Sequence, residues 1–220
     1  MIITIDGPSS SGKSTLAKLI SDHFSIIHID SGSIYRTITL LAIENKLIID
    51  KKVQVEKLIE CLNNNVITFK KNAENKFQIC INNEFVESKI RSTTISNNVS
   101  TVATIKEIRD YVLKLQREIA QNKSIVMDGR DIGSVVFPNA EYKFYLDASL
   151  KNRSKRRWTE LKDGEKNITI TTVESDLENR DIIDSNRVHS PLVIPENAIV
   201  INSDDLSINQ VLKKILHFIK

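Results

Sequence analysis

The chain has 220 residues, enough for one domain with a sizeable core. Hydrophobic residues make up 40% of it, charged residues 27%, and the formal net charge is only +3. This balance is typical of a globular protein and argues against a nucleic-acid-binding module or a protein held on an anionic membrane. No apolar run approaches the length of a membrane span, and the first residues lead directly into a strand. We therefore expect a cytoplasmic chain without a signal peptide.

The first strong motif follows a short β-branched run at residues 2–5 that predicts a strand. Asp6 ends this run, Gly7-x4-Gly12-Lys13-Ser14 comes next, and apolar residues then recur at helical spacing. Strand, glycine-rich loop and helix are the context of a phosphate-binding P-loop, although an ordinary Gly/Ser turn is the alternative. In a P-loop the lysine reaches the phosphates and the serine hydroxyl binds Mg²⁺. The predicted nucleotide-binding residues are Gly7, Pro8, Ser9, Ser10, Ser11, Gly12, Lys13, Ser14 and Thr15.

Strands and helices alternate through much of the chain. Residues 26–30 predict a second buried strand, which ends at Ser31-Gly32-Ser33, a turn that caps a helix beginning near Ile34. Further strands are predicted at residues 124–128, 142–147 and 199–201, and helices at residues 106–122, 150–161, 172–186 and 208–219. This rhythm predicts a parallel sheet with covering helices.

The rhythm breaks between residues 53 and 103. A helix is predicted at residues 53–62, and a helix rich in Ser, Thr and Asn at about residues 93–103. Between them, short runs at residues 66–69, 77–81 and 84–86 predict a small antiparallel meander. We interpret this part as an insertion into the α/β pattern.

Polar residues follow the predicted parallel strands, at the edge of the sheet where ligands bind. Asp30 and Asp128 end two of these strands. Either aspartate could orient a magnesium ion near the P-loop, and either could be a helix-cap or turn carboxylate.

Two later helices carry arginines at helical spacing. Arg153 and Arg157 lie one turn apart, and a solvated charged face would explain the neighbouring lysines better than these arginines. We interpret this helix as a lid over a transferring phosphoryl group. Arg180, Asp184 and Arg187 share one face of the next helix, where intrahelical ion pairing and a phosphate or ribose clamp both remain open.

Further motifs carry a family resemblance. They are Asp30-Ser-Gly-Ser-Ile-Tyr-Arg36, Asp128-Gly-Arg-Asp-Ile-Gly133, Val136-Phe-Pro138, Phe144-Tyr-Leu-Asp-Ala148, and Asn186-Arg187 with Ser190-Pro-Leu192. With the P-loop they resemble the bacterial-type cytidylate (CMP) kinases, a nucleoside monophosphate kinase group of P-loop kinases. The resemblance runs through nearly the whole chain, and the first two of these motifs together are its most specific part.

The resemblance implies an α/β fold with a parallel-sheet P-loop core and covering helices. An antiparallel meander would be inserted in the monophosphate-binding region, and a helical lid would complete the fold. One kinase domain would cover residues 1–220, divided into a core at about 1–36, 105–150 and 187–220, a monophosphate-binding insert at about 37–104, and a lid with its return helix at about 151–186.

The resemblance also implies an activity: ATP-dependent, in-line phosphorylation of CMP and dCMP to CDP and dCDP with Mg²⁺ on Ser14, in pyrimidine nucleotide metabolism. The partners would be these small molecules, with no nucleic acid or membrane, and we expect a monomer. The cations expected to assist catalysis are Lys13, Arg130, Arg153 and Arg157.

The same resemblance implies where the acceptor nucleotide binds. Its phosphate would lie against Arg36, Arg130, Arg180 and Arg187. Its cytosine would be read by Ser100, Arg109 and Asp131, since an acceptor and a donor match the base edge. Its sugar would face Ser31 and Asp184.

Two rival functions share parts of this pattern. A P-loop kinase for uridylate or for an acceptor that is not a nucleotide would have most of the same motifs. A GTP-dependent switch or binding protein belongs to another class, and the lack of an Asn-Lys-x-Asp guanine-reading sequence counts against it.

Overall fold

The computed structural model describes residues 1–50, 52–74, 76–162, 164 and 168–219. Positions 51, 75, 163, 165–167 and 220, which fall in the predicted insert, lid and core, lie outside the described residues. The chain divides into two units. We call Met1–His28 with Ser124–Lys220 the P-loop unit, and Ile29–Lys123 the middle unit. The three-part division expected from the sequence stays a prediction.

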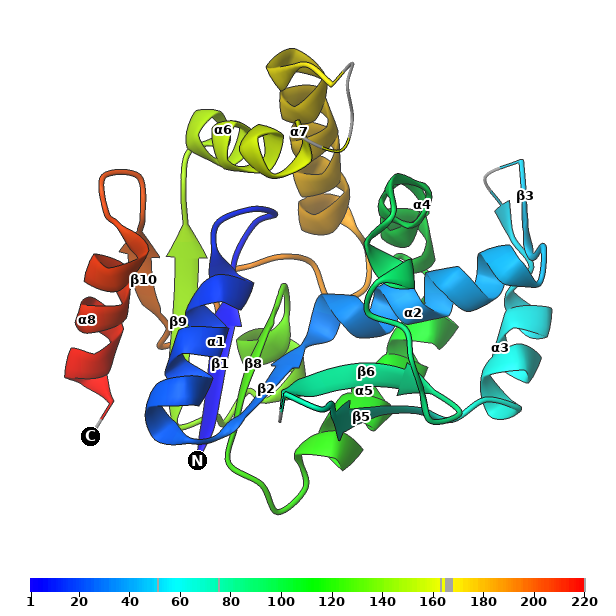
Figure 1. Ribbon diagram of the computed structural model, residues 1–220, viewed down its shortest axis with the longest axis horizontal. Coiled ribbons are helices and arrows are strands. Elements are labelled where there is room, and N and C mark those ends of the chain that lie inside the picture. The colour runs from blue at the N-terminus through cyan, green and yellow to red at the C-terminus, as the bar shows by residue number, and fades with distance from the viewer. Residues whose placement is uncertain (51, 75, 163, 165–167, 220) are drawn as a thin grey trace. The chain divides into compact units, whose positions relative to one another are not determined.

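The P-loop unit is built on a five-stranded sheet with the strand order β10-β9-β1-β8-β2. The strands are β1 Ile2–Asp6, β2 Ile27–Asp30, β8 Ile125–Gly129, β9 Tyr142–Asp147 and β10 Ile199–Asn202, and the first two residues of β2 belong to this unit. Parallel pairing joins β1 to β8 and β9, and β9 to β10, which confirms the predicted parallel sheet (Figure 1). Because β1 is the central strand, the loop that follows it leaves from the middle of the sheet edge.

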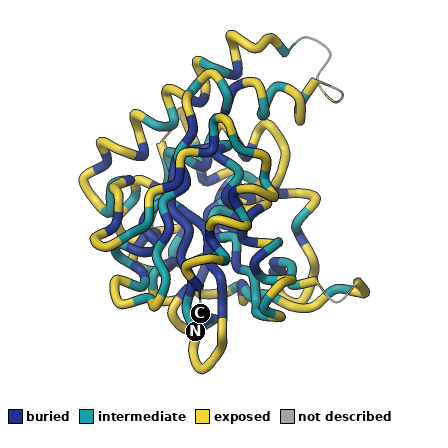
Figure 2. Tube along the Cα trace, turned by 90° about the vertical axis from the view of Figure 1, so that its left-hand side faces the viewer, coloured by how far each residue is buried: buried dark blue, intermediate teal, exposed yellow. Residues whose placement is uncertain are grey.

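The helices of the P-loop unit follow these strands. They are α1 Lys13–Phe24, α6 Leu150–Leu161, α7 Ile170–Asn186 and α8 Ile208–Phe218, with a π-helical turn, η2, at Ile132–Val136. α1 packs against α8, and α6 packs against α7 (Figure 1). Ile3, Leu16, Phe144 and Ile215 belong to one buried cluster, which joins the sheet to α1 and α8. In Figure 2 the central strands are buried over most of their length, whereas outward helix turns are exposed.

The middle unit has α2 at its centre and a core of its own. Its helices are α2 Ser31–Glu44, α3 Val55–Asn63, η1 Lys89–Arg91, α4 Thr93–Val102 and α5 Lys106–Ala120. Its antiparallel strands are β5 Ile67–Lys71, β6 Phe77–Ile81 and β7 Glu84–Phe85, in that order, and the short pair β3 Ile48–Ile49 and β4 Lys52–Val53. The three-stranded sheet confirms the predicted meander, whereas the short pair was not expected. Ile38, Leu58, Ile79 and Ile108 are among the fully buried core side chains.

The start of α2 differs from the prediction. The helix begins at Ser31, so the expected turn at Ser31-Gly32-Ser33 and the start near Ile34 were wrong. Asp30 is the N-cap residue, and its Oδ1 accepts the backbone N–H of Ser33 at 3.2 Å. A carboxylate caps a helix well and also complements the positive end of the helix dipole. The three small residues therefore form the first helical turn.

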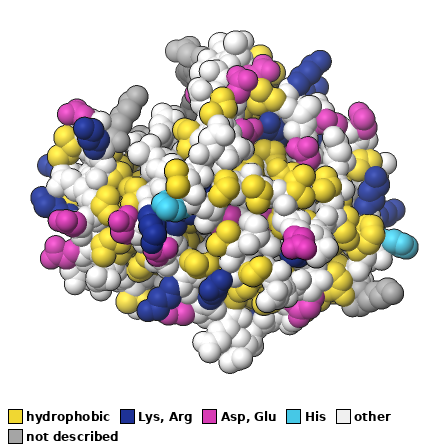
Figure 3. All heavy atoms as spheres, turned by 180° about the vertical axis from the view of Figure 1, so that it is seen from behind, with side chains coloured by type: hydrophobic (Ala, Val, Ile, Leu, Met, Phe, Trp, Pro, Cys, Tyr) yellow, Lys and Arg dark blue, Asp and Glu magenta, His cyan; other side chains and the backbone are white. Residues whose placement is uncertain are grey.

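Side chains of both charge signs are interspersed with apolar side chains on the face shown in Figure 3. The fields of interspersed opposite charges largely cancel beyond roughly a Debye length. This face therefore exerts little long-range attraction on a polyanion. Within the described residues, no helix combines the length and the apolar character needed to cross a membrane.

Gly7 is a position where the fold tolerates no side chain. Its φ is +147°, and a Cβ there would meet the backbone oxygen of Leu146 in β9 at 2.2 Å. We expect Gly7→Ala to lower the free energy of unfolding by about 1–3 kcal/mol, because the strain must displace backbone rather than a side chain. Urea unfolding measures this. Gly164→Ala is the control, because a Cβ at Gly164 would lie 3.8 Å from the nearest atom, Leu161 O. An equal loss of unfolding free energy in both variants would contradict the explanation.

Candidate functional site

The loop between β1 and α1 has the backbone of an anion-binding nest. Gly7 and Gly12 have φ angles of +147° and +100°, and Ser10 also has a positive φ. Gly12 is the N-cap residue of α1, and among the described residues no side chain caps that helix. Lys13 is folded back over the loop, where its Nζ donates to Pro8 O at 2.5 Å and lies 3.4 Å from Ser11 Oγ. Backbone N–H groups and this ammonium group can together bind a phosphate.

The electrostatics of the loop leave Lys13 poorly stabilised as a cation. Burial and the nearby charge of Arg130 lower the pKa of Lys13 to about 7, against the opposing effect of Asp128 and Asp6. A group in this state gains stabilisation from any anion placed beside it. The arrangement is thus one in which a bound phosphate favours the charged form of the lysine.

Asp6 is a structural part of the site that the sequence analysis missed. It is fully buried, and its two carboxylate oxygens accept the backbone N–H groups of Ile132 and Gly133 at 2.7 Å each. Burial raises the pKa of Asp6 to about 6, although these hydrogen bonds oppose the rise. The carboxyl group joins the end of β1 to η2 and so fixes the segment after β8. An aspartate that ends a buried strand was the available signal.

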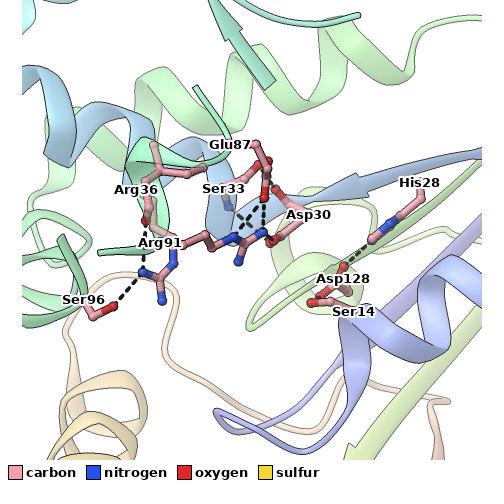
Figure 4. A network of polar contacts seen from close by, with 10 residues as sticks. Ser14, His28, Asp30, Ser33, Arg36, Glu87, Arg91, Ser96 and Asp128 are labelled. Carbon is pink, nitrogen blue, oxygen red and sulfur yellow. Dashed lines mark hydrogen bonds and ion pairs between the residues drawn. The ribbon is translucent and has the colours of Figure 1, made fainter. Parts of the chain in front are cut away.

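Asp128 connects the P-loop serine to a histidine. Asp128 Oδ2 accepts the Ser14 hydroxyl at 2.6 Å, and its Oδ1 lies 2.7 Å from His28 Nε2 (Figure 4). Burial raises the pKa of Asp128, but the contacts with His28 and Ser14 outweigh it and hold the pKa below its ordinary value. Asp128 is therefore an ionised carboxylate in direct contact with the predicted metal-binding serine.

Asp30, the other candidate for orienting a metal, has different partners within the middle unit. Its Oδ2 accepts a hydrogen bond from Arg91 Nη2 at 2.9 Å, and the same nitrogen donates to Glu87 Oε1 at 2.5 Å (Figure 4). Its Oδ1 caps α2 through Ser33. Both carboxylate oxygens are thus engaged in cap and ion-pair contacts, whereas Asp128 is bonded to the P-loop serine.

A cluster of arginines surrounds Asp184 on α7. Asp184 Oδ2 accepts from Arg130 Nε at 2.8 Å, and its Oδ1 is 3.6 Å from Arg187 Nη1. Arg187 Nη2 lies 3.6 Å from Asp131 Oδ1. The ion pairs of Asp184 thus reach Arg130 as well as its helical neighbour Arg187. From the spacing in sequence we predicted only that Arg180, Asp184 and Arg187 share one face of a helix.

Arg180 differs from the other arginines of this cluster in its hydrogen bonding. Its Nε is buried and has no hydrogen-bond partner within the described part of the chain. Burial and the charge of Arg130 lower the pKa of Arg180 to about 10. A buried donor without an acceptor is costly, so this cluster can accept an anion favourably.

The arginines of α6 have three different environments. Arg153 is buried, donates from Nε to Ala148 O at 2.9 Å and from Nη1 to Ser9 O at 3.2 Å, and pairs with Asp181 at 2.6 Å. Arg156 Nη1 donates to Ser11 O at 3.2 Å. Two arginines therefore bind backbone carbonyls of the P-loop, a role that the sequence did not indicate for Arg156. Arg157, whose side chain is 27% exposed, pairs with Glu160 at 2.9 Å.

Within the middle unit, α2 and α5 carry two of the predicted substrate residues, Ser31 and Arg109. Ser31 Oγ accepts from the buried Gln116 Nε2 at 2.7 Å. Arg109, also buried, lies 5.5 Å from the ring centre of Tyr35 and donates to Ala103 O at 3.1 Å. Tyr35 is one turn beyond Ser31 on α2, so the two contacts align the helices. Gln116 was missed, although its spacing four residues after Val112 on a buried face was a signal.

The other two predicted residues of this unit have separate positions. Arg36 is on α2 and donates from Nη1 to Ser96 Oγ at 3.0 Å (Figure 4). Ser100 is half-buried on α4. Their roles stay predictions.

The cluster around Asp184 predicts a stability loss in acid. The charges of Arg130 and Arg187 outweigh burial and hold the pKa of Asp184 below its ordinary 3.8. A carboxyl group with a lower pKa in the folded chain stabilises the fold above its unfolded pKa and loses this contribution as the pH falls through its folded pKa. We expect Asp184→Asn to cost about 2 kcal/mol near neutral pH, and this cost to shrink below about pH 4.

Urea unfolding at several pH values measures the shrinking difference between the Asp184→Asn variant and the unsubstituted chain. Asp176→Asn, at an exposed position of the same helix, is the matched control. A cost that stays constant in acid would contradict the proposed charge pairing.

The family model and the curated relatives agree on one family. The sequence model of the cytidylate kinase family matches residues 3–220. A cytidylate kinase of Clostridium botulinum is 40% identical over 218 residues, covering 99% of this chain and 97% of that protein. One of Fusobacterium nucleatum is 42% identical over 215 residues, covering 98% and 95%. A solved structure of an uncharacterized protein from Eubacterium ventriosum has a TM-score of 0.52 at 10% identity, covers 100% of this chain and 98% of its own, and supports the fold alone. The chain belongs to the cytidylate kinase family.

Proposed function

We propose that the chain transfers the γ-phosphoryl group of ATP to CMP, and also to dCMP, to give CDP or dCDP and ADP. Family membership supports the reaction. The observation that carries the proposal is a cluster of arginines, Arg130, Arg180 and Arg187, around Asp184 in the same unit as the P-loop, which we interpret as a second anion-binding place. A transfer between two phosphates needs a binding place for each. We expect this reaction in the cytoplasm and the chain as a monomer.

The donor nucleotide would bind to the P-loop. Backbone N–H groups of residues 7–15 would hold its phosphates, and Lys13 would neutralise charge on the group in transfer. A protonated Lys13 costs stability in the empty loop, because burial disfavours its charge. Bound phosphate would offset that cost, so the site is suited to a polyanion.

The residues present fit a magnesium ion, although within the described residues there is no cluster of His, Cys, Asp and Glu that could hold a metal by itself. Mg²⁺ prefers hard oxygen ligands and commonly uses one or two protein groups together with substrate phosphates. Ser14 Oγ and the ionised Asp128 beside it are groups of this kind. Ser14 would hold the ion and Asp128 would orient it through water, and the ion would supply charge neutralisation between the phosphates.

The acceptor nucleotide would use both anionic and base-reading residues. Its phosphate would lie against Arg180, whose Nε has no partner among the described residues, and against Arg36, Arg130 and Arg187. Ser100, Arg109 and Asp131 would read cytosine, and Asp184 with Ser31 would face the sugar. Because Ser31 accepts from Gln116, its own hydrogen is directed elsewhere and can be donated to the substrate.

No strong general base is needed, since the attacking phosphate oxygen is already anionic. Catalysis would come from alignment of the two nucleotides and from positive charge around a loose transition state. Lys13 and Arg130 would supply part of this charge. The lid proposed at about residues 151–186 would exclude water and limit ATP hydrolysis.

Within this lid, Arg153 and Arg157 would have different parts. The guanidinium group of Arg153 is held by Ala148 O, Ser9 O and Asp181, so it would assist catalysis by shaping the loop. Arg157 pairs with the exposed Glu160 and can leave that partner at little cost. Arg157 is thus the better candidate for direct contact with the phosphoryl group.

An acceptor panel tests the proposed function. With ATP and Mg²⁺, CMP and dCMP should drive ADP formation much faster than UMP, AMP or an acceptor that is not a nucleotide. We expect Asp131→Asn to lower the ratio of kcat/KM for CMP to that for UMP by about tenfold or more, because an amide can donate to the uracil carbonyl. Thermal unfolding checks that the variant folds. Turnover of UMP in preference to CMP by the unsubstituted chain would refute the assigned substrate, and an unchanged ratio would refute the role of Asp131.

Matched substitutions separate the two lid arginines. We expect Arg157→Met to lower kcat by about a hundredfold with little change in stability, because it removes charge needed only in the transition state. Arg153→Met should lower the free energy of unfolding as well, because it leaves Asp181 and two carbonyls without a charged donor. Steady-state kinetics and urea unfolding measure the two effects. A fully active Arg157→Met variant would exclude direct contact.

A further inference from the structure

Two short hydrogen bonds connect His28 to the P-loop through one carboxylate. His28, on β2, places its Nε2 2.7 Å from Asp128 Oδ1, and Asp128 Oδ2 lies 2.6 Å from Ser14 Oγ (Figure 4). The Asp128 side chain is only 3% exposed, whereas the His28 side chain is 21% exposed. Asp128 is thus the buried link between two more exposed residues, His28 on β2 and Ser14 at the start of α1.

The direction of both hydrogen bonds follows from the chemistry of the carboxylate. An ionised carboxylate accepts hydrogen bonds and donates none. Both neighbours must therefore donate, which places a hydrogen on Nε2 of His28 and directs the hydroxyl hydrogen of Ser14 toward Asp128. One donor on each oxygen fixes the plane of the Asp128 carboxylate.

The orientation of the Ser14 hydroxyl is the useful result. When its hydrogen points to Asp128, its lone pairs point away from Asp128 and are available to a cation. Without His28, one oxygen of a buried carboxylate would lose its donor, so rotation of the carboxylate away from Ser14 would become less costly. The ordered hydroxyl would then be lost although Ser14 itself is unchanged.

We propose that His28 is a positioning residue for magnesium-nucleotide binding: it holds Asp128 so that Ser14 presents its oxygen to the ion. The inference rests on the proposed function only in requiring that the P-loop binds a magnesium nucleotide, and it does not depend on the acceptor. Groups that orient the ligands of a metal typically change metal affinity by about 10- to 100-fold when removed.

Calorimetric titration with ADP, in excess Mg²⁺ and separately in EDTA, measures this effect without turnover. The quantity of interest is the factor by which Mg²⁺ tightens ADP binding. His28→Leu removes the donor, whereas His28→Gln keeps an N–H donor at the end of a side chain of similar reach. His23→Leu, at an exposed position of α1, is the matched control. Thermal unfolding establishes that each variant is folded.

We expect His28→Leu to reduce the Mg²⁺ factor about tenfold while ADP binding in EDTA is unchanged. His28→Gln should restore most of the factor, and His23→Leu should retain all of it. In an Asp128→Asn background, His28→Leu should have little further effect, because it acts through that carboxylate. An unchanged factor in His28→Leu, or an equal loss of binding with and without Mg²⁺, would overturn the proposal.

The proposed substrate is tested separately. A chain whose Mg²⁺ factor depends on His28 but which does not phosphorylate CMP keeps this inference and loses the proposed acceptor. A chain that phosphorylates CMP and shows no dependence on His28 keeps the function and loses the inference.

Discussion

Two poorly stabilised cations are the constraint on which the P-loop unit depends. Lys13 and Arg180 are both held with pKa values below their ordinary range, about 7 and about 10, by burial and by the charge of Arg130. Asp128 and Asp184 offset part of this charge through short contacts. A fold that holds such cations is less stable than it could be. Their presence makes physical sense if polyanionic ligands complete the site.

Much of this arrangement could be predicted from the sequence, where the pattern is local. The P-loop, the parallel strands and the meander each have a periodicity or motif of their own. The predicted start of α2 was wrong because Asp30 and the following serines can all cap a helix. In the structure the carboxylate of Asp30 is the N-cap, so the helix already begins at Ser31. Asp6, His28 and Gln116 were missed because their partners are 126, 100 and 85 residues away in sequence. No local pattern indicates such pairs.

The middle unit has two polar residues on a buried helix face. Gln116 and Arg109 lie on the buried face of α5, where apolar side chains would otherwise be expected. Gln116 donates to Ser31 on α2, and Arg109 donates from Nη1 to Ala103 O in the loop after α4. Polar groups buried in this way favour one helix arrangement over others, because a shifted helix would leave them unpaired.

The contacts of α6 with the P-loop have a consequence for the peptide groups themselves. The carbonyl oxygen of Ser9 belongs to the same peptide unit as the N–H of Ser10, and that of Ser11 to the same unit as the N–H of Gly12. Arg153 and Arg156 bind those two oxygens. A charged donor on a carbonyl polarises the whole peptide unit and strengthens its N–H as a donor, by about 10–30% in condensed-phase estimates. The two arginines therefore strengthen the N–H groups of Ser10 and Gly12 as donors, and these are among the groups with which the loop would bind a phosphate.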